Sequence, residues 1–77
     1  MKHSQKLILL EAFKRGEKHT AHSAYIKLNI ATLSQRINDI ERMGYQVHRE
    51  WVKSANAKFM IYWIPADQFK KIDYLHN

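Results

Sequence analysis

Residues 31–44 constrain the fold more than any other part of the chain, because a helical hydrophobic stripe there ends in a glycine. Leu33, Ile37 and Ile40 stand at positions i, i+4 and i+7, so they share one face of an α-helix. Gly44 suits the left-handed backbone conformation that ends many helices. The pattern predicts a short helix with one buried face and an opposite face of polar and cationic side chains.

Two strand-like runs follow this helix. In residues 45–51, four side chains alternate with polar ones, as in a strand with one face against the core: Tyr45, Val47, Arg49 and Trp51. Residues 59–64 are apolar on both faces, so one face must contact the tail or a dimer partner in addition to the main core. Between the runs, residues 52–58 include Ser54 and Asn56 and predict a hairpin loop.

Two further helices are predicted in the first part of the chain. Ser4 can cap a helix over residues 5–15. Thr20 can cap a shorter helix over residues 21–28. Asn29 tolerates the left-handed conformation and can end this second helix without a glycine.

The tail begins at Pro65, which ends the second run because it lacks a backbone N–H. Asp67 can cap a last helical segment. Apolar side chains recur at helical spacing in that segment: Phe69, Ile72 and Leu75 or Tyr74. We expect the tail to cover the second face of the last strand.

This order of elements is that of an α+β winged helix-turn-helix, with three helices, a C-terminal β-hairpin wing and a short terminal helix. The 77 residues suffice for one domain over 1–77, with a core at about 5–64 and a tail at 65–77. Cysteine is absent, so neither a disulfide nor a cysteine-ligated zinc stabilises it. No apolar run reaches transmembrane length, and we expect a cytoplasmic protein, bacterial or in a host cell if viral.

The net charge of +6 lies in residues 1–58, because residues 59–77 carry equal numbers of acids and bases. This distribution suits a polyanionic partner such as nucleic acid. A small soluble domain can also carry net charge for solubility alone. The charge therefore permits a nucleic-acid partner without requiring one.

The candidate DNA-binding residues lie on the polar face of the predicted third helix and in the hairpin loop. They are Thr32, Ser34, Gln35, Arg36, Asn38, Arg42, Lys53, Ser54, Asn56 and Lys58. Glutamine or asparagine can pair with adenine and arginine with guanine in the major groove, while lysines of a wing can contact phosphate or enter the minor groove. A polar helical face is usually only solvated, and the surrounding elements make the DNA interpretation stronger here. Arg36 lies closer to the buried edge, so it can contact phosphate or support the fold.

Other kinds of site have little support in the sequence. His19, His22 and His48 lack the partner ligands of a zinc site, so we expect capping or surface roles and no metal. No nucleophile elbow or glycine-rich phosphate loop is present, and we expect neither a cofactor nor enzymatic activity. The aromatic residues of the two strand-like runs are expected in the core or on the sheet surface rather than as platforms for single-stranded bases.

One progression of core and turn residues resembles the small phage and prophage helix-turn-helix domain family: Ile30, Leu33, Arg36, Ile37, Ile40, Gly44, Tyr45 and Val47. The resemblance extends over most of residues 5–64. It implies sequence-specific binding to duplex DNA by a transcription regulator or an excisionase-like architectural factor. Asn29 replaces the glycine that such proteins often use in the turn, and the tail lies beyond the shared region.

The expected partner is therefore double-stranded DNA, with residues 32–42 in the major groove, and no membrane. A domain this small makes few contacts with DNA. We therefore expect a homodimer or cooperative neighbours, bound to DNA half-sites that are one turn of the DNA helix apart, or a multiple of one turn. The last strand and the tail are the candidate dimer surface. The alternative is a protein-binding winged helix that inhibits or recruits a host nucleic-acid machine.

Overall fold

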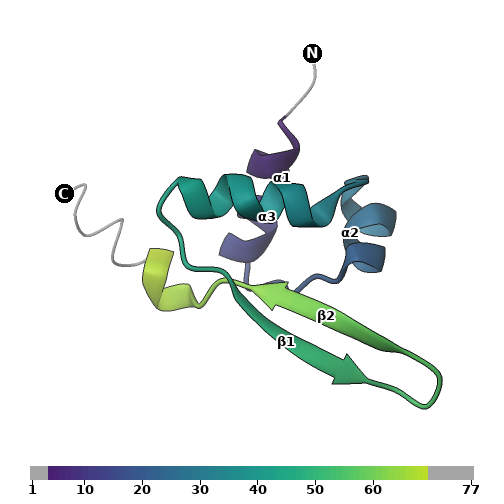
Figure 1. Ribbon diagram of the computed structural model, residues 1–77. Helices are drawn as coiled ribbons and strands as arrows, with labels where there is room; N and C mark the ends of the chain where they lie inside the picture. Colours follow the sequence, from purple (N-terminus) through teal and green to yellow (C-terminus); the bar gives the residue numbers. More distant parts are fainter. Residues whose placement is uncertain (1–3, 70–77) are drawn as a thin grey trace.

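The computed structural model describes residues 4–69, in which three helices precede a two-stranded antiparallel sheet. The elements are α1 (Gln5–Lys14), α2 (Ala21–Leu28), α3 (Leu33–Arg42), β1 (His48–Lys53) and β2 (Lys58–Trp63). Figure 1 shows the hairpin extending beyond the helices, and a short helical turn follows it over residues 66–69. The predicted α+β winged helix-turn-helix fold is confirmed. No helix within residues 4–69 is long and apolar enough to cross a membrane.

The first helix begins and ends where the sequence predicts, although only its end is fixed by a recognised cap. Ser4 occupies the N-cap position with an extended backbone, but its side chain makes no capping hydrogen bond, so that part of the prediction is wrong. Gly16 has a φ of 86°, and its N–H donates to the Phe13 carbonyl. The Glu17 N–H donates to the Ala12 carbonyl, which completes the paired bonds of a Schellman motif.

The second helix has both of its predicted caps. Thr20 accepts a hydrogen bond from the Ser23 N–H, and the Ser23 hydroxyl accepts one from the Thr20 N–H, forming a capping box. Asn29 adopts the left-handed conformation at φ 59° and ends the helix. Ile30 then enters the core and is fully buried. The turn between α2 and α3 is therefore set by local chemistry.

The core forms between the inner faces of the helices and the start of the tail. The stripe of α3, which comprises Leu33, Ile37 and Ile40, is buried as predicted. It packs with Leu9 and Phe13 of α1 in one cluster. The cluster also includes other buried side chains: Leu10, Ala24, Ile30, Val47, Ile64 and Phe69. Burial of these side chains is the main stabilising contribution in a domain of this size.

One residue far from the hairpin in the sequence pairs with the outer edge of β2, at the base of the hairpin, which is its end nearest the helices. His19, between α1 and α2, pairs antiparallel with Tyr62 of β2. The His19 N–H donates to the Tyr62 carbonyl at 2.9 Å, and the Tyr62 N–H donates to the His19 carbonyl at 2.8 Å. This bridge joins the base of the hairpin to the helices, and no local sequence pattern predicts it.

The predicted half-buried alternation over residues 45–51 is wrong beyond Val47. Arg49 and Trp51 are exposed, and Trp51 keeps 58% of its accessible surface. β1 begins only at His48, where the hairpin leaves the helices, so most of it has no core beneath it. The loop is also shorter than predicted and spans residues 54–57, closed by a 2.8 Å bond from the Ser54 N–H to the Ala57 carbonyl.

The described part of the tail packs against the connection between α3 and β1. The Gln68 side chain accepts from the Gln46 N–H at 2.8 Å and donates to the Gln46 carbonyl at 2.7 Å. Phe69 is buried beside Tyr45, with 5.4 Å between ring centroids. Asp67 lies inside the helical turn over 66–69, so it does not cap it. Residues 70–77, which include the other expected contacts Ile72, Tyr74 and Leu75, lie outside the described residues.

Candidate nucleic-acid interface

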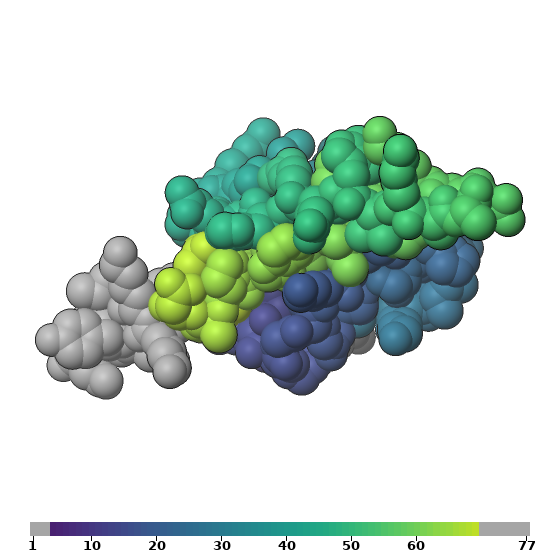
Figure 2. Space-filling view, turned by 90° about the horizontal axis from the view of Figure 1, so that it is seen from below, coloured from purple at the N-terminus to yellow at the C-terminus, as the bar shows by residue number. Residues whose placement is uncertain are grey.

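The third helix and the hairpin lie on one side of the molecule. In Figure 2, α3 (teal) and the hairpin (green) occupy the upper part of the view, while α1 and α2 (purple and blue) occupy the lower part. A single extended partner can therefore contact both elements at once. The residues that the sequence proposes for DNA binding belong to these two elements and to the N-cap of α3.

The outer face of α3 is polar, and its side chains form no hydrogen bond or ion pair with other described residues. Ser34, Gln35, Asn38 and Arg42 are exposed, opposite the buried stripe. None of the four makes a side-chain hydrogen bond or an ion pair with another described residue. Thr32 is exposed at the N-cap position, and its side chain makes no capping bond. These side chains can reach a ligand without first breaking a protein contact.

Arg36 differs from the other candidates in α3 because it is engaged by its own helix. Its Nε lies 3.3 Å from the Asp39 carboxylate, and both side chains keep only 26% of their exposure. The same Nε is buried and has no hydrogen-bond partner, so its contact with Asp39 is an ion pair alone. The position favours a supporting role for Arg36 over contact with a base.

The hairpin end places two cations opposite each other. Lys53 and Lys58 are cross-strand partners in the register of β1 and β2, and both are exposed together with Ser54 and Asn56 of the loop. Like charges that face each other across a sheet are destabilising. The Lys58 ammonium also lies 4.7 Å from the centroid of the Trp51 ring, which favours a position over that side chain. A bound anion between the two lysines would relieve their repulsion.

An ion pair connects the end of α3 to the start of the hairpin. The Arg49 Nη2 donates to the Glu41 carboxylate at 2.8 Å, and the Arg49 guanidinium lies 5.5 Å from the Tyr62 ring centroid. These contacts restrict the angle between α3 and the hairpin. The alternation in residues 45–51 predicts Arg49 on the inner face of the strand and does not predict this pair, which joins two different elements.

A second polar cluster lies on the loop between α1 and α2. His19 is 2% exposed, so of the capping or surface role expected for it the surface role is wrong. Its Nδ1 lies 2.9 Å from the Ser23 hydroxyl, and its Nε2 lies 2.7 Å from the Glu17 carboxylate. The hydrogen bond from His19, followed by the one from Arg15, lowers the pKa of the Glu17 carboxyl below its ordinary value of 4.5. Through Ser23, this cluster fixes the capping box of α2.

The other histidines remain separate from this cluster. His22 and His48 are exposed, and His48 lies beside Trp63 with 5.8 Å between ring centroids. Within residues 4–69 no three His, Cys, Asp or Glu side chains come together in a way that could hold a metal ion. The cluster around His19 is therefore interpreted as a structural element of the loop.

The order of elements, the bridge at His19 and the projecting hairpin define the winged helix-turn-helix class. The chain matches the family model described as "Winged helix-turn-helix domain" over residues 4–61, and it belongs to that family. The match includes all three helices and most of the hairpin. Comparisons with curated proteins and with solved structures gave no match.

Proposed function

We propose that this protein binds double-stranded DNA, with α3 in the major groove and the loop between β1 and β2 as a wing on the neighbouring backbone or minor groove. The observation that carries the proposal is the pairing of two surfaces on one side of the molecule. One is the unengaged polar face of α3, and the other is the cationic end of the hairpin. Membership of the winged helix-turn-helix family supports the same ligand.

Within this proposal, the first turns of α3 read bases. Gln35 and Asn38 are exposed amides that can each pair with adenine, and Thr32 and Ser34 can donate to phosphate or to a base edge. A good bidentate pair contributes about 1–3 kcal/mol of discrimination between bases. Arg36 is the exception, because Asp39 already engages its guanidinium.

The phosphate contacts are assigned to the cations that no described carboxylate neutralises. Arg42 lies in the last turn of α3, and Lys53 and Lys58 lie at the end of the hairpin. Each neutralised phosphate adds about −0.9 to the slope of log affinity against log salt concentration. Three such contacts would give a slope of about −3.

The biological role that fits best is a small transcription regulator or an excisionase-like architectural factor, acting in transcription control or phage recombination. A single domain of 77 residues covers few base pairs, so useful specificity requires a dimer or neighbouring copies on adjacent half-sites. Both roles use the same groove-reading residues, and the arrangement of half-sites distinguishes them.

A second function, binding to a protein that handles nucleic acid, is supported by one observation. Tyr25 and Ile26 are adjacent on α2 and keep 58% and 62% of their exposure. Exposed apolar neighbours are more typical of protein contacts than of DNA contacts. This pair lies on a different helix from the DNA-reading face, so the two functions are compatible.

Fluorescence anisotropy with a random-sequence duplex at several salt concentrations tests the DNA proposal. We expect affinity to fall steeply with salt, and Arg42→Ala to reduce the magnitude of the slope by about 0.9. Gln35→Ala should leave the slope unchanged and weaken discrimination between sequences. Lys14→Ala is the matched control, because it removes one exposed cation from α1. Salt-independent binding, or equal effects of Arg42→Ala and Lys14→Ala, would contradict the proposed face.

A further inference from the structure

β2 has one edge paired with β1 and a second edge that is open over part of its length. Tyr62 uses its outward N–H and carbonyl to pair with His19. Backbone groups alternate in direction along a strand, so those of Met60 and Lys58 point toward the same outer edge. The chain after His19 turns into α2 at Ala21 and does not follow β2 further. Among the described residues, no backbone group pairs with the outer edge at Met60.

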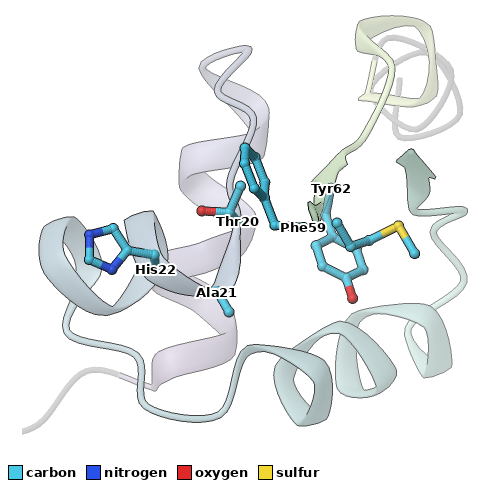
Figure 3. A pocket seen from close by; sticks show the side chains of 6 residues that line it. Thr20, Ala21, His22, Phe59 and Tyr62 are labelled. Atoms are coloured by element: carbon cyan, nitrogen blue, oxygen red, sulfur yellow. The ribbon is translucent and has the colours of Figure 1, made fainter. Parts of the chain in front are cut away.

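An apolar hollow of about 470 Å³ lies beside this open edge. Its lining comes from the start of α2 and from β2: Thr20, Ala21, His22, Phe59, Met60 and Tyr62. Figure 3 shows His22 and Ala21 of α2 and Tyr62 of β2 on opposite sides of the view, with Phe59 next to Thr20 between them. Its volume falls within the range of about 300–1,000 Å³ that is typical of ligand sites. Apolar side chains of an added strand have room to enter it.

The charges around the open edge of β2 indicate which charge a bound segment should carry. Lys58 lies at one end of the edge, and Lys18, next to His19, lies toward the other end with its ammonium 4.7 Å from the Trp63 ring centroid. No carboxylate is among the residues that line the hollow. Lysine on an exposed strand edge opposes pairing with a second copy of the same strand. An acidic segment is favoured instead.

We propose that the open edge of β2 and the adjoining hollow bind an extended segment of a partner protein, in which apolar and acidic side chains alternate. The segment adds a strand to the sheet through the backbone groups of Met60 and Lys58. Its apolar side chains enter the hollow beside Met60 and Tyr62, and its carboxylates, on the opposite face of the sheet, contact Lys18 beside the Trp63 ring. The site does not include the exposed face of α3, and it shares only Lys58, at the hairpin end, with the proposed DNA contacts.

The test uses the full chain and a fluorescein-labelled octapeptide in which valine and glutamate alternate. We expect the peptide to shift the amide signals of Lys58 and Met60 in ¹⁵N correlation spectra and to slow their hydrogen exchange. An octapeptide in which lysine replaces glutamate should bind about ten times more weakly or not at all.

Two matched alanine substitutions locate the site. Ala21→Trp fills the hollow and should weaken binding of the valine-glutamate peptide by at least about tenfold. Ala66→Trp adds the same bulk at an exposed alanine that does not line the hollow, and it should leave binding unchanged. Circular dichroism of both variants verifies that they fold.

Several results would overturn the inference. These are the absence of amide shifts at about 1 mM peptide, shifts confined to α3, or equal binding of the glutamate and lysine peptides. Protection of the Met60 amide together with self-association in sedimentation experiments, without peptide, would assign the edge to a second copy. DNA binding that fails while peptide binding persists would overturn the proposed function and leave this inference intact.

Discussion

Reversal of one charge at the hairpin end, Lys53→Glu, should stabilise the protein while it weakens DNA binding. Lys53 and Lys58 are direct cross-strand partners. Two like charges about 6 Å apart in water repel by about 0.7 kcal/mol, and a change of sign turns this repulsion into attraction. Side-chain flexibility and screening reduce the energy difference between the repulsive and the attractive pair. We therefore expect a gain of about 0.5–1 kcal/mol in the free energy of unfolding at low salt.

The same substitution removes a proposed phosphate contact and adds a repulsive charge. The slope of log affinity against log salt concentration should therefore lose at least about 0.9 of its magnitude. Urea unfolding at low ionic strength measures the stability, and anisotropy with a labelled duplex measures the slope. The intermediate variant Lys53→Gln should give about half of the stability gain.

A double substitution tests whether the stability gain of Lys53→Glu comes from its charge interaction with Lys58. Lys53→Glu with Lys58→Glu restores like charges across the strands, so the gain of the single variant should disappear. Two outcomes would refute the reasoning. One is a Lys53→Glu variant less stable than the parent at low salt, and the other is a DNA affinity that does not change.

Three further predictions concern the fold and the loop that supports it. Ile37→Ala should lower the free energy of unfolding by about 2–5 kcal/mol in urea titrations, because it leaves a cavity in the buried stripe of α3. Asn29→Gly should change stability by only a few tenths of a kcal/mol, whereas Asn29→Val should cost about 1–2 kcal/mol at the same positive φ; equal effects would refute the conformational argument. The lowered pKa of Glu17 stabilises the fold above the unfolded pKa, and this stabilisation is lost as pH falls through the folded pKa. The difference in unfolding free energy between the parent and Glu17→Gln should thus shrink as pH falls below about 5, and a difference that does not change in that range would contradict this assignment.

Local sequence signals predicted the helices well. The stripe of Leu33, Ile37 and Ile40 has the period of a helix, and the three residues are buried. Thr20 and Asn29 act on backbone groups only a few residues away, so their roles could be inferred without knowledge of the fold. Ser4 shows the limit of this reasoning, because a suitable residue type at a helix start does not ensure a capping bond.

The features that the sequence did not predict depend on where the elements lie relative to one another. Alternation in residues 45–51 defines two faces, but it does not reveal that the strand leaves the core after Val47. The bridge from His19 to Tyr62 and the ion pair between Arg49 and Glu41 join distant segments. The polar residue types of α3 predicted which of its faces is exposed. They could not show that the Asp39 carboxylate lies 3.3 Å from Arg36 Nε.

The central claim is that the outer face of α3 and the hairpin end contact DNA together. Amide shift mapping in ¹⁵N correlation spectra, with and without a short duplex, tests this claim most directly. We expect the largest shifts at Gln35, Asn38 and Arg42 and in the loop from Lys53 to Lys58, with little change along the exposed side of α1. Shifts confined to α1 or α2, or no shifts at low salt, would contradict the claim.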